Sequence, residues 1–353
     1  MQYTQEELVQ RLKTNAVVRQ NGIEKIDKGI PFYENKKGMD PRVKQLMLDE
    51  ESTKLKKPIE LADLEEIRSS GGFKNADLSQ GIRTENRNIF QEDSTLRVRV
   101  YNRGEEKKPA IVYYHGGGFF EGDMDVVENP CKLLAQETGA VVISVEYRLA
   151  PEFPYAAGLT DCLEAVRYVY DFADELSIDR EVIGLVGDSV GGNLALGVNH
   201  LSTGEPWTIS YLGLLYPLVD LSDFSGEKWN MAAYDFSEDE ALIRRELINM
   251  RQSLFFIQSL YLDDLEQAIS PLVSPVLSEV KQNIPPVTII TAEFDYLKVQ
   301  GTEFARQIAD AAVPVRHIEY KGMDHAFVEK LGYYPQAADA ISEISRHFKE
   351  TVY

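Results

Sequence analysis

The stretch Gly187-Asp188-Ser189-Val190-Gly191 places a serine between two glycines in the spacing G-x-S-x-G. It follows an apolar run at residues 182–186 and precedes an apolar stretch with helical spacing. Glycines on both sides of a serine let a strand and a helix approach closely, and the sharp turn between them exposes the hydroxyl. A serine hydroxyl attacks well only when a base takes its proton and a third group orients that base. The sequence should therefore also supply a histidine and an acid.

His325 is the histidine best placed to act as the base. It lies in Lys321-Gly322-Met323-Asp324-His325, just past a strand predicted at residues 315–320, where a loop can turn it back toward Ser189. The chain has four other histidines, which fall in a glycine motif, a helix, a strand and the polar C-terminal helix: His115, His200, His317 and His347.

The acid is expected between the serine and the histidine, which is one of the chain orders in which such triads occur. Residues 291–297 follow a predicted strand and offer Glu293 and Asp295. We favour Asp295, because Glu293 lies nearer the strand end and alternates to the other side. Asp324 adjoins His325 in the sequence and would have to bend back to reach its ring.

Acyl transfer also needs N–H donors for the oxyanion of the tetrahedral intermediate. His115-Gly116-Gly117-Gly118 follows an apolar strand predicted at residues 110–114, and consecutive glycines leave their amides uncovered. The N–H of Val190, the residue after the nucleophile, is a further expected donor. A phosphate cradle is disfavoured, since the chain lacks both G-x-G-x-x-G and a lysine-bearing P-loop.

The elements that must position these residues alternate between strands and helices. Such alternation predicts an α/β fold, with a mostly parallel central sheet and helices on both faces. Strands are expected near residues 95–100, 110–114, 140–145, 182–186, 209–215, 287–291 and 315–320.

Two intervals fall outside this alternation and are expected to form a helical cap. Residues 1–85 are charged and helical in character, and Asp40 before Pro41 predicts a helix start. Residues 218–269 insert a polar loop and a helix from about Ala241 to Tyr261 after a core strand. We therefore divide the chain into an N-terminal cap segment (1–85), a first core part (86–217), a cap insertion (218–269) and a second core part (270–353).

Composition excludes several partners and locations. The net charge of −20 over 353 residues disfavours nucleic acid and anionic membranes, which would repel the chain. No stretch reaches 18 apolar residues, and the start lacks the pattern of a secretory signal, so we expect a cytoplasmic protein without membrane insertion. The two cysteines, Cys131 and Cys162, lack metal-ligand spacing and are expected to be buried. We expect no metal and no cofactor.

The sequence resembles the hormone-sensitive-lipase family of α/β-hydrolase carboxylesterases, the bacterial esterases with an HGGG motif. The resemblance extends from about residue 95 to the C-terminus and is carried by four features in the family's order. They are His115-Gly116-Gly117-Gly118-Phe119, Tyr147-Arg148-Leu149-Ala150-Pro151-Glu152, Gly187-Asp188-Ser189-Val190-Gly191-Gly192-Asn193, and the loops of Asp295 and His325.

The resemblance implies a catalytic triad of Ser189, Asp295 and His325. It also implies an oxyanion hole made by the N–H groups of Gly117, Gly118 and Val190. The family's caps combine N-terminal helices with an insertion, its triple-glycine loop is associated with bulky alcohol groups, and its members are often homodimers.

Two departures from the family pattern stand out. Val190 replaces the usual alanine and is expected to narrow the acyl pocket. Asp295-Tyr296-Leu297-Lys298 replaces a more usual proline and arginine pattern around the acid.

We therefore expect a cofactor-free serine carboxylesterase that acts on small-molecule esters with short- to medium-chain acyl groups through an acyl-enzyme. The sequence does not distinguish this carboxylesterase from an amidase, a deacetylase or a lipase on the same fold. A non-catalytic small-molecule receptor is disfavoured, since such proteins usually lose a triad member and this chain keeps all three.

Overall fold

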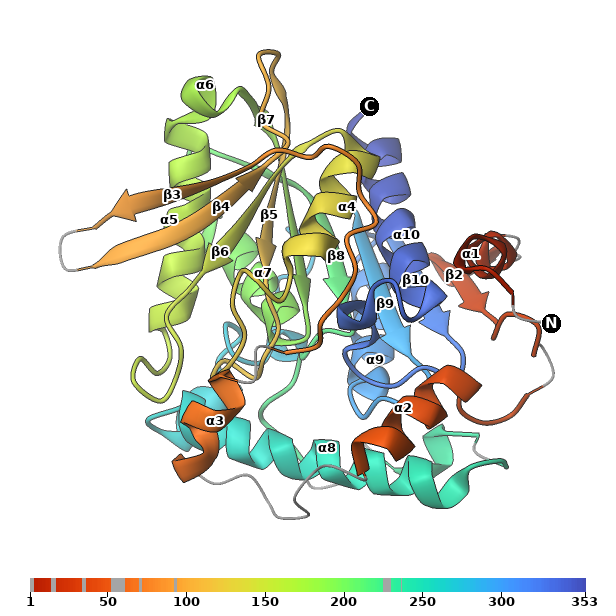
Figure 1. Ribbon diagram of the computed structural model, residues 1–353. Helices are drawn as coiled ribbons and strands as arrows, with labels where there is room; N and C mark the ends of the chain where they lie inside the picture. The colour runs from red at the N-terminus through yellow and green to blue at the C-terminus, as the bar shows by residue number, and fades with distance from the viewer. Residues whose placement is uncertain are drawn as a thin grey trace.

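A ten-stranded sheet runs through the protein in the order β1-β2-β10-β9-β8-β7-β5-β6-β4-β3 (Figure 1). The computed structural model describes residues 3–13, 17–33, 36–51, 61–69, 72–91, 94–224, 230–235 and 237–353. Six neighbouring strands of this sheet, in the order β10-β9-β8-β7-β5-β6, are all parallel to one another. The predicted α/β class with a mostly parallel sheet is confirmed.

The parallel strands are buried because helices cover both faces of the sheet. Every residue of β9 and β10 is buried. The six strands are β5 (Lys108–Tyr114), β6 (Val141–Glu146), β7 (Ile178–Asp188), β8 (Ile209–Leu215), β9 (Val287–Ala292) and β10 (Val315–Tyr320). Each lies within a few residues of its expected place in the sequence.

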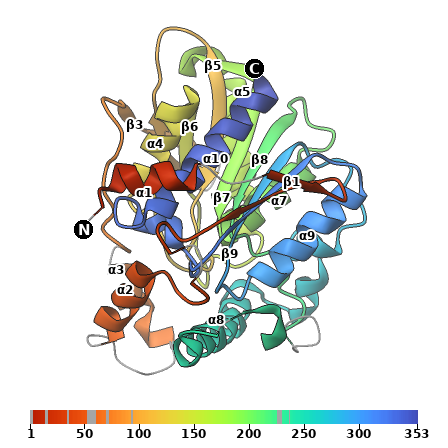
Figure 2. The ribbon, with the colours of Figure 1, turned by 90° about the vertical axis from the view of Figure 1, so that its right-hand side faces the viewer.

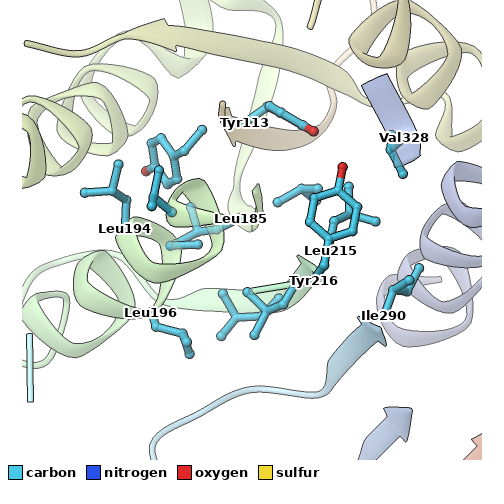
Figure 3. Packing of buried hydrophobic residues seen from close by; sticks show 14 of the residues in the cluster. Tyr113, Leu185, Leu194, Leu196, Leu215, Tyr216, Ile290 and Val328 are labelled. Carbon is cyan, nitrogen blue, oxygen red and sulfur yellow. The ribbon is translucent and has the colours of Figure 1, made fainter. Parts of the chain in front are cut away.

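Four of the helices pack in two pairs. Helix α4 (Glu128–Thr138) packs against α10 (Pro335–Val352), and α5 (Ala157–Asp171) packs against α7 (Val190–Leu201). Helix α9 (Lys298–Asp310) packs on β9 and β10, and the short α6 (Ala173–Leu176) precedes β7. Figure 3 shows part of the buried cluster between these layers, including Leu185, Leu194 and Leu215.

The N-terminal segment differs from the expected all-helical character. After α1 (Gln5–Leu12), residues Val17–Gln20 (β1) and Ile23–Lys28 (β2) form an antiparallel hairpin, and β2 pairs parallel with β10. The expectation of helices was therefore wrong for residues 17–28. The turn is Asn21-Gly22, both with positive φ, at 50° and 78°. This dipeptide is favoured in two-residue hairpin turns, because both of its residues tolerate that conformation.

The opposite edge of the sheet carries a second hairpin. Strand β3 (Thr84–Phe90) pairs antiparallel with β4 (Thr95–Tyr101), which in turn pairs antiparallel with β6. In β4, Leu96, Val98 and Val100 are buried and alternate with arginines, and the strand expected near residues 95–100 is confirmed.

The remaining elements gather beyond one end of the sheet. In Figures 1 and 2, α2 (Pro41–Glu51), α3 (Leu64–Ser69) and α8 (Glu240–Tyr261) lie together on that side. Short 3-10 turns complete the chain: η1 (Leu61–Asp63), η2 (Met231–Ala233), η3 (Leu265–Ile269), η4 (Pro275–Leu277) and η5 (Phe327–Lys330). Grouping α2, α3 and α8 as a cap, with the four-part division of the chain, stays a prediction.

The structure describes the aromatic residues of segment 218–236 only in part. Phe224 and Tyr234 are buried, whereas Trp229 and Phe236 lie outside the described residues. Within the described part of the chain, no helix combines the length and apolarity needed to cross a membrane.

Candidate active site

Ser189 occupies a strained turn between β7 and α7. Its φ of 55° and ψ of −117° are rare for a residue with a side chain, and such strain concentrates at functional sites. Glycine is needed beside it, since a Cβ atom at Gly187 would lie 2.3 Å from the carbonyl oxygen of Gly191. The Ser189 N–H donates to the Leu215 carbonyl at 2.8 Å, which fixes the turn to the end of β8.

The structure brings Ser189, His325 and Asp295 into one hydrogen-bonded chain. His325 Nε2 lies 2.9 Å from Ser189 Oγ, and His325 Nδ1 lies 2.7 Å from Asp295 Oδ2. The three residues follow the ends of β7, β9 and β10. Ser189 and His325 are 136 positions apart in the sequence. This arrangement lets the imidazole accept the serine proton while the carboxylate orients the ring.

The two alternative acids point elsewhere. Glu293 accepts the N–H of Gly322 at 2.8 Å and pairs with Lys321 at 3.4 Å. Asp324 Oδ1 is buried and has no hydrogen-bond partner among the described residues. Asp295 is buried, and its second oxygen accepts the N–H of Leu297 at 2.9 Å, so its carboxylate is fixed on both sides.

The electrostatic surroundings favour a protonated imidazole once it forms. Burial lowers the pKa of His325, but the charge and hydrogen bond of Asp295, together with the charge of Glu329, outweigh burial. The net effect raises the pKa of His325 above its ordinary value of 6.5. Asp295 therefore stabilises the imidazolium that forms when the serine loses its proton.

The glycine loop after β5 leaves backbone donors available. Gly117 and Gly118 have φ of 110° and 60°, and a Cβ atom at Gly117 would lie 2.2 Å from the Glu121 carbonyl oxygen. Neither of their N–H groups bonds to any described residue. Val190 is the first residue of α7, so its N–H has no acceptor within the helix.

Asp188 ties the serine turn to the glycine loop, a role that sequence reasoning did not assign. Its Oδ1 accepts the hydroxyl of Tyr113 and the N–H of Gly116, each at 3.0 Å. Burial and the nearby charge of Glu329 raise the pKa of Asp188 to about 7, although both hydrogen bonds act in the opposite direction. Its place directly before Ser189 was the only signal in the sequence.

Tyr216 packs against the imidazole and was also missed. Its ring meets the His325 ring edge-on, with centroids 5.0 Å apart and planes at 65°. The residue follows β8 directly and is buried, and Figure 3 shows its hydroxyl directed toward the segment of Val328. An edge-on aromatic contact of this kind restricts the rotation of the histidine ring.

A cavity of about 210 Å³ lies beside the glycine loop. Three of the residues that line it carry carboxylates and one carries a guanidinium. The lining includes Ile67, Arg68, Gly116, Gly117, Glu121, Asp123, Val126, Leu149 and Glu329.

The described residues hold no group of three or more histidine, cysteine, aspartate or glutamate side chains arranged to bind a metal ion. Both cysteines are buried and unpaired, and the predicted burial is confirmed.

Comparisons with known proteins identify the family of this chain. A family model described as alpha/beta hydrolase fold matches residues 111–329. Carboxylesterase NlhH of Mycobacterium tuberculosis is 31% identical over 265 residues, which cover 73% of this chain and 80% of that protein. An arylesterase of Saccharolobus solfataricus is 29% identical over 246 residues, covering 69% and 77%. Among solved structures, a hyperthermophilic esterase of Pyrobaculum calidifontis has a TM-score of 0.73 and 28% identity, covering 89% of this chain and 98% of its own.

Proposed function

Because this chain belongs to the hormone-sensitive-lipase-like family of the alpha/beta hydrolase fold, and is a carboxylic ester hydrolase, we propose that it cleaves short- to medium-chain acyl esters through an acyl-enzyme formed on Ser189. The observation that carries the proposal is the hydrogen-bonded chain from Ser189 through His325 to Asp295. A strained serine on a strand-to-helix turn, bonded to an oriented histidine, is suited to nucleophilic attack on a carbonyl carbon.

In the proposed first half-reaction, Ser189 Oγ attacks the ester carbonyl while His325 Nε2 takes the hydroxyl proton. The charge that develops on the carbonyl oxygen is stabilised by the N–H groups of Gly117, Gly118 and Val190. His325 then donates its proton to the departing alcohol, and the acyl group remains on the serine.

In the second half-reaction, a water molecule attacks the acyl carbon. His325 takes a proton from this water and returns it to Ser189 Oγ, which releases the carboxylic acid. Asp295 stays ionised throughout and holds the imidazole in the tautomer that presents an unprotonated Nε2 to the serine.

Ser189→Ala tests this assignment. We expect kcat for p-nitrophenyl butyrate to fall by roughly 10⁴-fold or more, as for loss of the nucleophile in other triads. A fluorophosphonate should label the wild type at Ser189 and leave the variant unlabelled. Ser210→Ala, in β8 and remote from the turn, is the matched control and should keep wild-type activity. Retention of hydrolysis by Ser189→Ala would refute the proposal.

A further inference from the structure

The chain that directly follows the glycine loop is held from two sides by segments far away in the sequence. The Phe119 ring stacks on Tyr261, at the end of α8, with centroids 3.7 Å apart and planes at 3°. The Phe120 ring meets Phe256 of α8 edge-on, with centroids 5.7 Å apart. Helix α8 therefore packs against the side chains of the two residues after Gly118.

Arg68 of α3 holds the backbone of the same residues. Its Nε donates to the Phe120 carbonyl at 2.7 Å, and its Nη2 donates to the Ala150 carbonyl, also at 2.7 Å. The guanidinium also forms a two-point ion pair with Glu152, through Nη1 at 2.7 Å and Nη2 at 2.8 Å. A planar guanidinium that makes all of these bonds has one orientation, so Arg68 fixes Phe120 relative to residues 150–152.

The loop is held mainly through its backbone, and within it the Gly117 carbonyl accepts the N–H groups of Phe120 and Glu121 at 3.0 and 2.9 Å. Gly116, Gly117 and Gly118 have no side chains to pack, and glycine loses more conformational freedom on ordering than any other residue. At its first end the loop is fixed by the Gly116 N–H, which donates to Asp188 at 3.0 Å. At its other end the fixed point is the Phe120 carbonyl on Arg68. The Phe119 carbonyl also accepts the Ala150 N–H at 2.8 Å. The carbonyls of Phe119 and Phe120 are therefore both held, directly or through Arg68, against residue 150.

We propose that Arg68 is a positioning residue for the oxyanion hole, holding the N–H groups of Gly117 and Gly118 in the geometry that the transition state needs. Donors aimed at the oxyanion contribute most when they are ordered before the reaction starts, and a small displacement reduces the rate strongly. Through Arg68, the N-terminal segment thus acts on the chemical step. The inference rests on the proposed serine-esterase mechanism.

The test compares Arg68→Ala with wild type on p-nitrophenyl acetate, a substrate too small to need extensive cap contacts. We expect kcat to fall by roughly 10- to 100-fold, which is no more than the fall in kcat caused by removing one oxyanion donor. KM should change by no more than about twofold. Arg68→Lys keeps a cation that can reach one carbonyl and should recover part of kcat. Arg306→Ala removes an arginine that pairs with Glu303 and Asp310 on α9, and should leave both constants unchanged.

A second measurement separates loop positioning from general weakening of the cap. A trifluoromethyl ketone adds to the serine and places an oxyanion among the same donors. Its inhibition constant should rise in Arg68→Ala by the same factor by which kcat/KM falls, because both report transition-state stabilisation. The binding of a non-reactive ketone of equal size should stay unchanged.

Two results would overturn the inference: a rise in KM at constant kcat, or an unchanged inhibition constant for the fluoroketone. If Arg68→Ala does not fold, as judged by circular dichroism, Arg68→Lys decides by the same two criteria. Failure of the inference alone would leave Ser189→Ala inactive, whereas failure of the proposed function would leave Ser189→Ala active.

Discussion

His325 must be unprotonated at Nε2 before it can accept the serine proton, so its pKa sets the acidic limb of the activity profile. The pKa of this histidine is raised above 6.5, hence kcat/KM should increase with pH through a midpoint above that value. In Asp295→Asn the group that raises this pKa most is gone, while burial remains, so the midpoint should move to lower pH and the rate should fall by about 10⁴-fold.

The pH profile of p-nitrophenyl acetate hydrolysis measures this shift. Glu293→Gln serves as the control, because Glu293 bonds to Gly322 and Lys321 and makes no bond to the imidazole. A midpoint that moves in Glu293→Gln but not in Asp295→Asn would show that Glu293, and not Asp295, is the acid of the triad.

Val190 combines two properties at one position. Its N–H is a proposed oxyanion donor, and its buried side chain is predicted to narrow the acyl pocket. Val190→Ala should therefore raise the ratio of kcat/KM for octanoate to that for acetate by roughly tenfold, since one or two methylenes in an apolar pocket change selectivity by this order. Val198→Ala, also buried in α7, should leave the ratio unchanged. A chain-length profile that is identical in Val190→Ala and wild type would contradict the prediction.

The residues of the site differ in how far the sequence could identify them. Ser189 and Asp295 each follow an apolar strand, His325 follows a strand of mixed polar and apolar residues, and parallel strands bring their carboxyl ends to one edge of the sheet. Asp188 ends β7 and Tyr216 follows β8 directly, but nothing in the sequence indicated which residues they contact. Their partners Tyr113 and His325 lie 75 and about 110 positions away in the chain, and only the packed sheet makes these contacts visible.

At the scale of elements, the periodicity of apolar residues located the parallel strands but missed the N-terminal hairpin. The two strands in residues 17–28 are short and contain several charged residues, and only Ile26 and Lys28 in β2 are buried. The hairpin forms because β2 can pair with the open edge of β10, a tertiary effect that overrides weak local preference. The Asn21-Gly22 turn was the one local signal for it.

The hairpin is fastened to the core by a buried charge. Lys28 Nζ donates to the Leu12 carbonyl at 2.7 Å and to Glu343 at 2.7 Å, and it pairs with Asp339 at 2.9 Å. Removing one partner of a buried ionic group leaves the others uncompensated, which costs about 3–5 kcal/mol. This lysine therefore links α1 and β2 to α10.

Lys28→Met should lower the free energy of unfolding by about 3–5 kcal/mol, measured by urea denaturation. Lys25→Met, in the same strand, removes a partly exposed lysine that pairs with Asp27 at 3.5 Å, and its effect should stay within about 0.5 kcal/mol. Equal losses in the two variants would mean that burial of the Lys28 charge is not what fastens the hairpin.

At the scale of the whole molecule, the net charge of −20 and the lining of the cavity act in the same direction. Glu121, Asp123 and Glu329 line the cavity beside the glycine loop, whereas Arg68, the cation among its described lining residues, is already paired with Glu152. A cavity with this balance of charge next to the oxyanion loop lowers the local concentration of anions and slows their association.

An anionic ester such as p-nitrophenyl hemisuccinate should therefore be hydrolysed with a kcat/KM roughly tenfold below that of the neutral butyrate ester at low salt. The ratio should approach unity as salt is added, because screening at about 0.1 M acts over about 10 Å. At a pH well above the His325 midpoint, where a change in the pKa of that histidine does not alter the rate, Glu329→Gln should raise kcat/KM for the anionic ester selectively, since it removes a charge from the cavity lining. Glu106→Gln, exposed on the β4–β5 loop, removes the same charge from the remote surface and separates the cavity from the net charge. If the two variants raise the ratio equally, the net charge governs substrate choice; if salt changes neither ester's kcat/KM, the electrostatic argument fails.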